Sequence, residues 1–293
     1  MSLIGHGVAV VTPFNKKGDI DYEALENHVN NLIISQVDYL VVLGTTSEVS
    51  TLSVLEQIEI SEFIVKINKN RLPLVIGVGG NDTSSVVHSF NKFNLSNFQS
   101  ILSICPYYNL PNQRGLFKHF IEISKKCPIP VVIYNVPSRT GINIEPNTVF
   151  ELLKKSSNII GIKEASNLKN QMEELIKFSS NNFQIISGDD NTAIDSILAG
   201  ASGVISVIGN AFPFQTNKLV KLSLSNDVFK ASKKRNELKR INTLISKLGN
   251  PAGIKCLISQ LGICENILRL PLVPVSEEEF NKIKIELNTL SIN

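Results

Sequence analysis

Lys163 is the residue of this sequence best placed to do chemistry on a carbonyl group. It follows the apolar run Ile159-Ile160-Gly161-Ile162, which predicts a strand buried on both faces, as in a parallel sheet covered by helices. Apolar surroundings disfavour the charged ammonium group, and a neutral amine is a nucleophile toward carbonyl carbons. A plainer interpretation is that Lys163 ends the strand and reaches water, so the residues placed beside it decide between the two.

Hydroxyl, phenol and guanidinium groups follow other apolar runs of the chain. These are Thr45 and Thr46 after 38–44, Tyr108 after 100–106, and Tyr134 and Arg139 at and after 130–135. A lysine can form a Schiff base with a keto acid, hydroxyls can transfer the protons, and an arginine can bind a carboxylate in a bidentate fork. Singly, Tyr134 suits barrel packing, Thr46 a helix cap and Arg139 a surface ion pair. Together they favour carbonyl chemistry.

Metal and phosphate chemistry are not indicated. His6, His28, His88 and His119 are scattered along the chain, whereas a metal-dependent aldolase needs imidazole or carboxylate ligands grouped at one site. Asp189 and Asp190 follow the seventh apolar run, where they would repel a phosphate. We therefore expect neither a metal site nor the phosphate site common in barrels.

Eight strand-like runs, with helix-length segments between them, must position these residues. The runs are 7–14, 38–44, 72–79, 100–106, 130–135, 159–165, 183–189 and 203–208. Strands alternating with helices indicate βαβ units and a parallel sheet. Eight units predict an α/β fold, the (β/α)₈ TIM barrel, whose active site lies at the C-terminal ends of the strands. A doubly wound open sheet is the alternative, but the turn Thr12-Pro13-Phe14-Asn15 has no GxGxxG phosphate loop.

After residue 212 the strand signal stops. Helices are predicted at 227–248, 251–261 and 277–290. The sequence thus predicts a catalytic barrel over 1–224 and a C-terminal helical extension over 225–293 that packs on it. The basic residues of 227–248 are interpreted as a solvated helix face.

The amino-acid composition limits the classes of function that this chain can have. The chain has 293 residues, 43% hydrophobic and 19% charged, with a net charge of +3, which is too small to favour nucleic acid or an anionic membrane. The four cysteines form no CxxC pair, no signal peptide is evident, and no apolar run approaches a membrane helix. These features predict a cytoplasmic protein with reduced thiols.

The motifs together resemble the dihydrodipicolinate synthase family over nearly the whole chain. They are Gly44-Thr45-Thr46, Tyr107-Tyr108-Asn109, Tyr134-Asn135-Val136-Pro137-Ser138-Arg139-Thr140-Gly141, Gly161-Ile162-Lys163-Glu164-Ala165 and Ser187-Gly188-Asp189-Asp190. The resemblance implies a lyase that condenses pyruvate with L-aspartate 4-semialdehyde to 4-hydroxy-tetrahydrodipicolinate. This is the first committed step of diaminopimelate and lysine biosynthesis. It also implies a homotetramer built from two tight dimers, and no cofactor beyond a covalent Schiff base.

The resemblance also implies a role for each site residue. Lys163 would form the imine with pyruvate, and Tyr134 would donate and accept protons beside it. Thr46 and Tyr108 would extend the proton relay, with Tyr108 coming from the neighbouring subunit. Thr45 and Thr46 would hold the pyruvate carboxylate, and Arg139 the carboxylate of aspartate semialdehyde. The backbones of Gly188 and Ile205 would line the pocket.

An effector site for free lysine is implied in a degenerate form. The corresponding positions are Val49, Ser50, Val54, Gln57, Asn81, Ser85 and Tyr107. Ser85 stands where lysine-sensitive members offer a carboxylate, and Val54 where they offer a His, so we expect weak inhibition. Ser47 stands where the family usually has Gly, which would cost about 1 kcal/mol if that position needs a positive φ.

Two alternatives remain. One is another pyruvate-dependent lyase, such as N-acetylneuraminate lyase or a keto-deoxy-sugar aldolase. These enzymes share the Lys and the Tyr but have a different sequence where this chain has Ser138-Arg139-Thr140. Arg139 favours a short aldehyde that carries a carboxylate. The other alternative is a non-catalytic barrel that serves as a regulator, which the intact Lys163 and relay hydroxyls disfavour.

Overall fold

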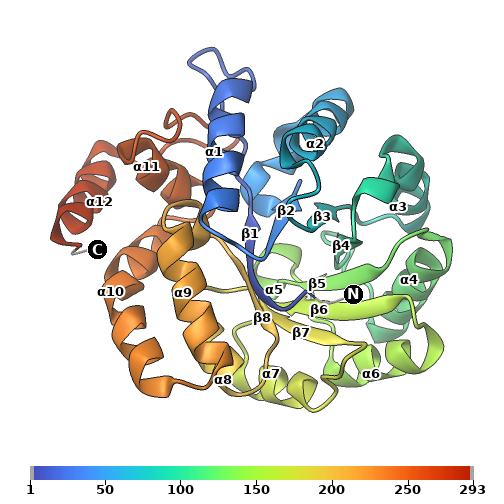
Figure 1. Ribbon diagram of the computed structural model, residues 1–293. Coiled ribbons are helices and arrows are strands. Elements are labelled where there is room, and N and C mark those ends of the chain that lie inside the picture. Colours follow the sequence, from blue (N-terminus) through green and yellow to red (C-terminus); the bar gives the residue numbers. More distant parts are fainter. Residues whose placement is uncertain (1–2, 291–293) are drawn as a thin grey trace.

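Eight parallel strands close into a barrel in the computed structural model, which describes residues 3–290 (Figure 1). The strands follow sequence order, and β1 pairs with both β2 and β8. They are β1 (Gly5–Ala9), β2 (Tyr39–Val42), β3 (Leu74–Gly77), β4 (Ser100–Ile104), β5 (Val131–Asn135), β6 (Ile159–Glu164), β7 (Gln184–Ser187) and β8 (Gly203–Ser206). The predicted (β/α)₈ barrel is confirmed.

Helices surround the barrel, one after each strand. The ring consists of α1 (Tyr22–Ile34), α2 (Val54–Asn68), α3 (Thr83–Ser89), α4 (Gln113–Lys126), α6 (Pro146–Lys155), α7 (Lys169–Ile176), α8 (Ala193–Leu198) and α9 (Pro213–Leu224). A short α5 (Pro137–Thr140) follows β5 directly. Local sequence fixes several helix starts: Asp21 caps α1, and Ser53 with Glu56 forms a capping box at α2.

Two apolar layers hold the barrel together. Strand residues such as Val41, Leu102 and Ile186 form one cluster inside the barrel, while a larger cluster joins the outer strand faces to the helices. Both faces of each strand are therefore buried, which explains why the strands read as continuous apolar runs.

The last three helices, α10 (Val228–Lys247), α11 (Ala252–Gln260) and α12 (Glu277–Thr289), pack on one another beside α9 (Figure 1). Their apolar cluster includes Val11, Ile208 and Phe212 from the barrel. The C-terminal helices thus share a core with the barrel. Residues 1–2 and 291–293, at the ends of the two predicted regions, lie outside the described residues.

One local prediction was wrong. The first strand spans Gly5–Ala9 and not 7–14. The last hydrogen bond to β2 comes from the Val10 N–H, and the apolar residues beyond the strand are explained by packing: Val10 and Phe14 against the outer core, Val11 against the C-terminal helices. The helix expected after the eighth strand, to which no residue range was assigned from the sequence, is α9; Pro213 occupies its first turn, where the missing N–H costs nothing.

Helices and cysteines show two further features. None of the helices described over 3–290 is long and apolar enough to cross a membrane. Cys105, Cys127 and Cys256 are buried free thiols, and Cys264 is a partly exposed one.

Buried histidines predict an acid-sensitive fold. Burial lowers the pKa of His6 to about 3 and that of His119 to about 4. Unfolded histidines titrate near 6.5, so below about pH 6.5 the unfolded chain binds protons that the folded chain does not. The free energy of unfolding should fall by about 1.4 kcal/mol per pH unit for each such histidine, down to about pH 4.

Urea unfolding at several pH values measures this slope. His6→Leu removes a ring whose nitrogens have no hydrogen-bond partner within the described chain, and it should reduce the slope by about 1.4 kcal/mol per pH unit. His88→Gln, on an exposed helix surface, is the matched control. Identical slopes for wild type and His6→Leu would contradict the assignment.

Candidate active site

Lys163 and Tyr134 lie side by side at the mouth of the barrel. They are paired residues on β6 and β5, and paired residues of adjacent strands point to the same face. The Lys163 Nζ lies 4.3 Å from the centre of the Tyr134 ring. Both side chains are buried, with exposed fractions of 6% and 7%, so the amine and the phenol share a small space that is largely shielded from the surface.

A β-bulge sets this pairing. The register shifts where Val131 faces Ile159 and Val132 faces Gly161, so Ile160 is the extra residue of β6. If pairing continued regularly from Val131 and Ile159, Tyr134 would face Ile162, and Lys163 would point to the opposite side. The bulge therefore aims the amine at the phenol.

A carboxylate behind the strand holds its end in place. The Glu164 Oε2 accepts hydrogen bonds from the side-chain amides of Asn135 and Gln171, each at 2.9 Å, and its Oε1 accepts one from the backbone N–H of Ser166. These bonds tie β5, β6 and α7 together directly beside the Lys163–Tyr134 pair. Glu164 thus positions the pair without sharing its cavity.

The turn after β2 brings in two hydroxyls. Thr45–Ser47 forms one turn of 3₁₀ helix, in which Thr46 is buried. Ser47 does not have a positive φ; that conformation belongs to Glu48, at 57°. The Ser47 hydroxyl instead donates to the carbonyl of Gly44 at 2.7 Å. The cost that a positive φ would have imposed on Ser47 therefore does not arise.

Asn250, which sequence reasoning missed, connects this turn to the arginine. Its side-chain amide donates to the Thr46 Oγ1 at 3.0 Å, and its backbone carbonyl accepts from the Arg139 guanidinium at 2.8 Å. Asn250 lies between α10 and α11, so the C-terminal helices supply part of the site. The only available signal was an Asn-Pro turn between two predicted helices.

Gly188 keeps space open for the lysine. A Cβ atom at this position would lie 3.1 Å from the Lys163 Cε and 2.6 Å from the Ala165 Cβ. Any side chain would therefore push against the strand that carries the amine, which explains a glycine here.

A cavity of about 230 Å³ contains most of the predicted site. The structure brings together Thr45, Thr46, Tyr134, Arg139, Lys163 and Gly188 on its wall. Two predicted residues are absent from that wall. Ile205 lies in the apolar cluster inside the barrel, and Tyr108 is 89% exposed with φ 75°. Within one chain, Tyr108 therefore does not reach Lys163.

The predicted effector residues also come together. All seven, Val49, Ser50, Val54, Gln57, Asn81, Ser85 and Tyr107, line one cavity of about 620 Å³ that extends to Thr45, Tyr134 and Lys163. Asp82 lines it too, but its carboxylate caps α3 by accepting from the Ser85 N–H at 2.8 Å. Hydrogen bonds from the Ser85 hydroxyl and from its backbone N–H lower the pKa of Asp82.

The arrangement suits covalent chemistry on a small keto acid. A buried amine lies against a phenol, a threonine hydroxyl is fixed by an amide, and a guanidinium faces the same space. Over the described residues 3–290, no three His, Cys, Asp or Glu side chains group closely enough to hold a metal ion.

Comparison with known proteins agrees with this geometry. A model described as the dihydrodipicolinate synthetase family matches residues 3–290. A 4-hydroxy-tetrahydrodipicolinate synthase of Karelsulcia muelleri is 44% identical over 287 residues, which cover 98% of this chain and 97% of that protein.

Solved structures give the same picture. A dihydrodipicolinate synthase from Aquifex aeolicus superimposes with a TM-score of 0.94 and 35% identity, covering 98% of this chain and 97% of that one. A chloride-inhibited dihydrodipicolinate synthase from Acinetobacter baumannii, complexed with pyruvate, gives a TM-score of 0.96 at 30% identity and covers both chains fully.

Proposed function

The chain belongs to the dihydrodipicolinate synthetase family, and from this premise we propose that it is a lyase of lysine biosynthesis, condensing pyruvate with L-aspartate 4-semialdehyde. The product is 4-hydroxy-tetrahydrodipicolinate, and the reaction takes place in the cytoplasm. The observation that carries the proposal is the shared cavity of Lys163, Tyr134 and Arg139. One wall of that cavity can hold a keto acid covalently while another binds a second carboxylate.

The Lys163 amine attacks the ketone carbon of pyruvate, and loss of water leaves an imine. Loss of a methyl proton converts the imine to an enamine, whose carbon attacks the aldehyde of the second substrate. The aldehyde oxygen takes up a proton, and the substrate's own amino group then displaces Lys163 and closes the ring. These steps balance in atoms and electrons without an oxidant, a reductant or a metal ion.

Tyr134 and Thr46 serve as the proton carriers. The Tyr134 phenol is adjacent to the amine, where it can accept and return the protons of imine formation. Thr46 accepts from the Asn250 amide, which leaves its own hydroxyl proton free to donate along the relay. Thr45 and Thr46 hold the pyruvate carboxylate, and Arg139, fixed by the Asn250 carbonyl, binds the carboxylate of the aldehyde.

A substrate comparison tests the proposal. With pyruvate present, the protein should consume L-aspartate 4-semialdehyde, and it should not release pyruvate from N-acetylneuraminate. The reverse preference would support the sugar-acid lyase alternative. Arg139→Ala should raise the KM for the semialdehyde more than the KM for pyruvate, because the carboxylate of the semialdehyde loses the guanidinium that binds it and the carboxylate of pyruvate does not.

We propose that the active site is completed by a second chain within a tetramer of two tight dimers. Tyr107, Tyr108 and Leu110 are exposed on one loop, and Val54 and Leu55 are exposed at the start of α2. Tyr107 and Val54 line the same cavity, so these apolar side chains suit an interface. The backbone of Tyr108, with a positive φ, carries strain that such a contact would offset.

Subunit mixing should therefore restore activity. Tyr108→Phe and Lys163→Ala proteins are each expected to be severely impaired, but a mixed dimer holds one site with an intact Lys163 and a partner's intact Tyr108. Mixing Tyr134→Phe with Lys163→Ala is the control, because both changes fall in the same chain's site. If the first pair exchanges subunits and recovers nothing, Tyr108 does not act across the interface.

We propose that free lysine inhibits weakly or not at all. Ser85 offers no charge, Val54 cannot hydrogen-bond, and the Asp82 carboxylate is occupied at the N-terminus of α3. Loss of one hydrogen bond to a charged group weakens binding by roughly 10- to 100-fold.

The measurement is an activity assay titrated with L-lysine, with Ser85→Glu as the variant expected to gain sensitivity. Half-inhibition at sub-millimolar lysine in the wild type would contradict the prediction. Asp82→Ala would then show whether Asp82 supplies the missing charge.

A further inference from the structure

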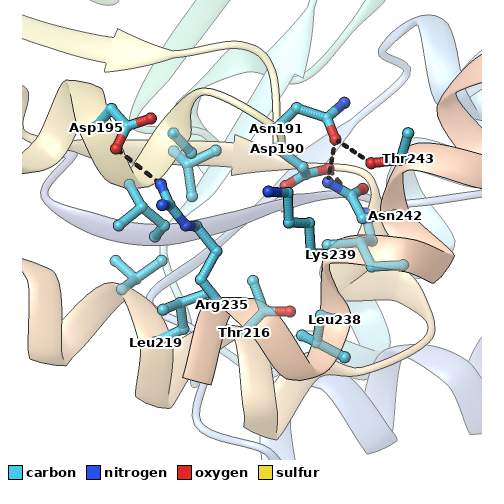
Figure 2. A pocket seen from close by; sticks show the side chains of 15 residues that line it. Asp190, Asn191, Asp195, Thr216, Leu219, Arg235, Leu238, Lys239, Asn242 and Thr243 are labelled. Carbon is cyan, nitrogen blue, oxygen red and sulfur yellow. Dashed lines mark hydrogen bonds and ion pairs between the residues drawn. The ribbon is translucent and has the colours of Figure 1, made fainter. Parts of the chain in front are cut away.

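A separate cavity of about 400 Å³ lies where α8, α9 and α10 meet β8 (Figure 2). It shares Asp190 and Asn242 with the active-site cavity but contains neither Lys163 nor Tyr134. The two spaces are thus back to back, separated by the turn after β7 and by α10. None of the roles described above uses this second space.

The walls of this cavity suit an aliphatic group. Ile194, Val204, Leu219 and Leu238 line it, and each is at least nine-tenths buried. The volume falls in the range of small-molecule sites and exceeds the roughly 30 Å³ share of a single water more than tenfold. The well-packed cores around it make such a space unusual for a purely structural feature.

Polar atoms without partners also lie in this wall. The hydroxyl of Thr216, a residue only 4% exposed, and the Nε of Arg235 have no hydrogen-bond partner among residues 3–290. Buried polar groups are nearly always satisfied, so unsatisfied ones indicate a missing partner. Both atoms can donate. The Oδ1 of Asn242 also has no hydrogen-bond partner among the described residues. Asn242 lines both cavities, however, so its oxygen does not indicate a ligand of this cavity in particular.

Two acidic and two basic side chains line this cavity: Asp190, Asp195, Arg235 and Lys239. One amino group of the Arg235 guanidinium already pairs with Asp195 at 2.7 Å, and the Asp190 carboxylate accepts from the backbone N–H groups of Val207 and Ile208. Lys239 lies one turn beyond Arg235 on the cavity side of α10, with no ion pair in the part of the chain described (Figure 2). Lys239 is therefore the one basic side chain of this lining without an ion pair among the described residues, and it can meet an anionic ligand.

We propose that this cavity binds a small branched aliphatic monocarboxylate. Its hydrocarbon part fills the space between Ile194, Leu219 and Leu238. Its carboxylate accepts from Lys239, the Arg235 Nε and the Thr216 hydroxyl. A neutral molecule of the same shape lacks the charge, and acetate lacks the hydrocarbon, so both bind more weakly.

Calorimetric titration of the full-length protein with 4-methylpentanoate tests this proposal, in the presence of saturating pyruvate to keep the probe out of the active site. We expect a dissociation constant of about 1 mM or tighter. The isosteric 4-methylpentan-1-ol should bind at least about tenfold more weakly, which corresponds to about 1.4 kcal/mol. Binding that disappears when pyruvate is added belongs to the active site and would overturn the proposal.

Variants locate the site. Lys239→Ala should weaken binding about tenfold, because the carboxylate loses its charged partner. Lys233→Ala, an exposed lysine of α10 outside the lining, should leave the affinity unchanged. Ala193→Leu places a larger side chain in the cavity wall and should abolish binding while the protein remains active. If the Ala193→Leu protein does not fold, the test rests on the affinity of Lys239→Ala for 4-methylpentanoate and on the affinity of the wild type for 4-methylpentan-1-ol. No binding by the wild type, or equal affinity in wild type and Lys239→Ala, would overturn the proposal.

Discussion

Replacing Lys163 by Ala should reduce kcat by roughly 10⁴- to 10⁶-fold, because removing the nucleophile of a covalent mechanism removes nearly all of the chemical acceleration. The side chain makes no ion pair or hydrogen bond with any described residue, and it contacts the Tyr134 ring. The fold should therefore persist. Steady-state rates with pyruvate and L-aspartate 4-semialdehyde, alongside a circular dichroism spectrum, measure both points.

Tyr134→Phe is the matched comparison for Lys163→Ala. It keeps the ring beside the amine and removes only the hydroxyl, so kcat should fall by about 10²- to 10⁴-fold, the usual contribution of a positioned proton carrier. Imine formation should slow, but the adduct should still form on prolonged incubation. A Lys163→Ala protein that retains activity within tenfold of wild type would exclude Lys163 as the nucleophile.

The second large effect concerns stability. Lys255 on α11 and Glu48, the residue that ends the Thr45–Ser47 turn, form an ion pair in which both side chains are fully buried. The Lys255 Nζ also donates to the carbonyl of Ile267 at 2.9 Å and lies 3.9 Å from the centre of the Phe14 ring. Glu48 in turn accepts from the Arg269 backbone N–H. The pair joins the barrel mouth to the C-terminal helices.

Lys255→Ala should lower the free energy of unfolding by about 3–5 kcal/mol, because it leaves the Glu48 charge buried and unpaired. Urea unfolding at pH 7 measures the loss. The double variant Glu48→Gln with Lys255→Met should recover most of it, since neither residue then carries a charge. Lys282→Ala, which breaks an exposed ion pair of α12, is the control and should show no measurable change. An equal loss of unfolding free energy in Lys255→Ala and Lys282→Ala would contradict the argument.

The sequence predicted the barrel and most of the active-site wall because both depend on local patterns. Apolar runs bounded by turns identify strands, and in a closed parallel barrel the C-terminal ends of all strands meet on one face. Thr46, Tyr134 and Lys163, which follow or end three different strands, therefore had to lie near one another. The structure adds the distances and the bulge at Ile160 that aligns Tyr134 with Lys163.

Features that depend on tertiary contacts were not predictable. Asn250 reaches Thr46 only because α10 and α11 fold back over the barrel mouth, and no local pattern reports that contact. The range of β1 was misjudged because Val10 and Val11 are apolar for packing against helices and not for pairing. The positive φ at Glu48 follows from its buried partners, which lie more than 200 residues away in sequence.

Borohydride trapping tests the central claim most directly. The protein is incubated with pyruvate alone, reduced with borohydride, digested and analysed by mass spectrometry. The proposed mechanism predicts one reduced pyruvate adduct per chain, on the peptide that contains Lys163, and none in Lys163→Ala. An adduct on another lysine, or no adduct in a protein that is active on both substrates, would contradict it.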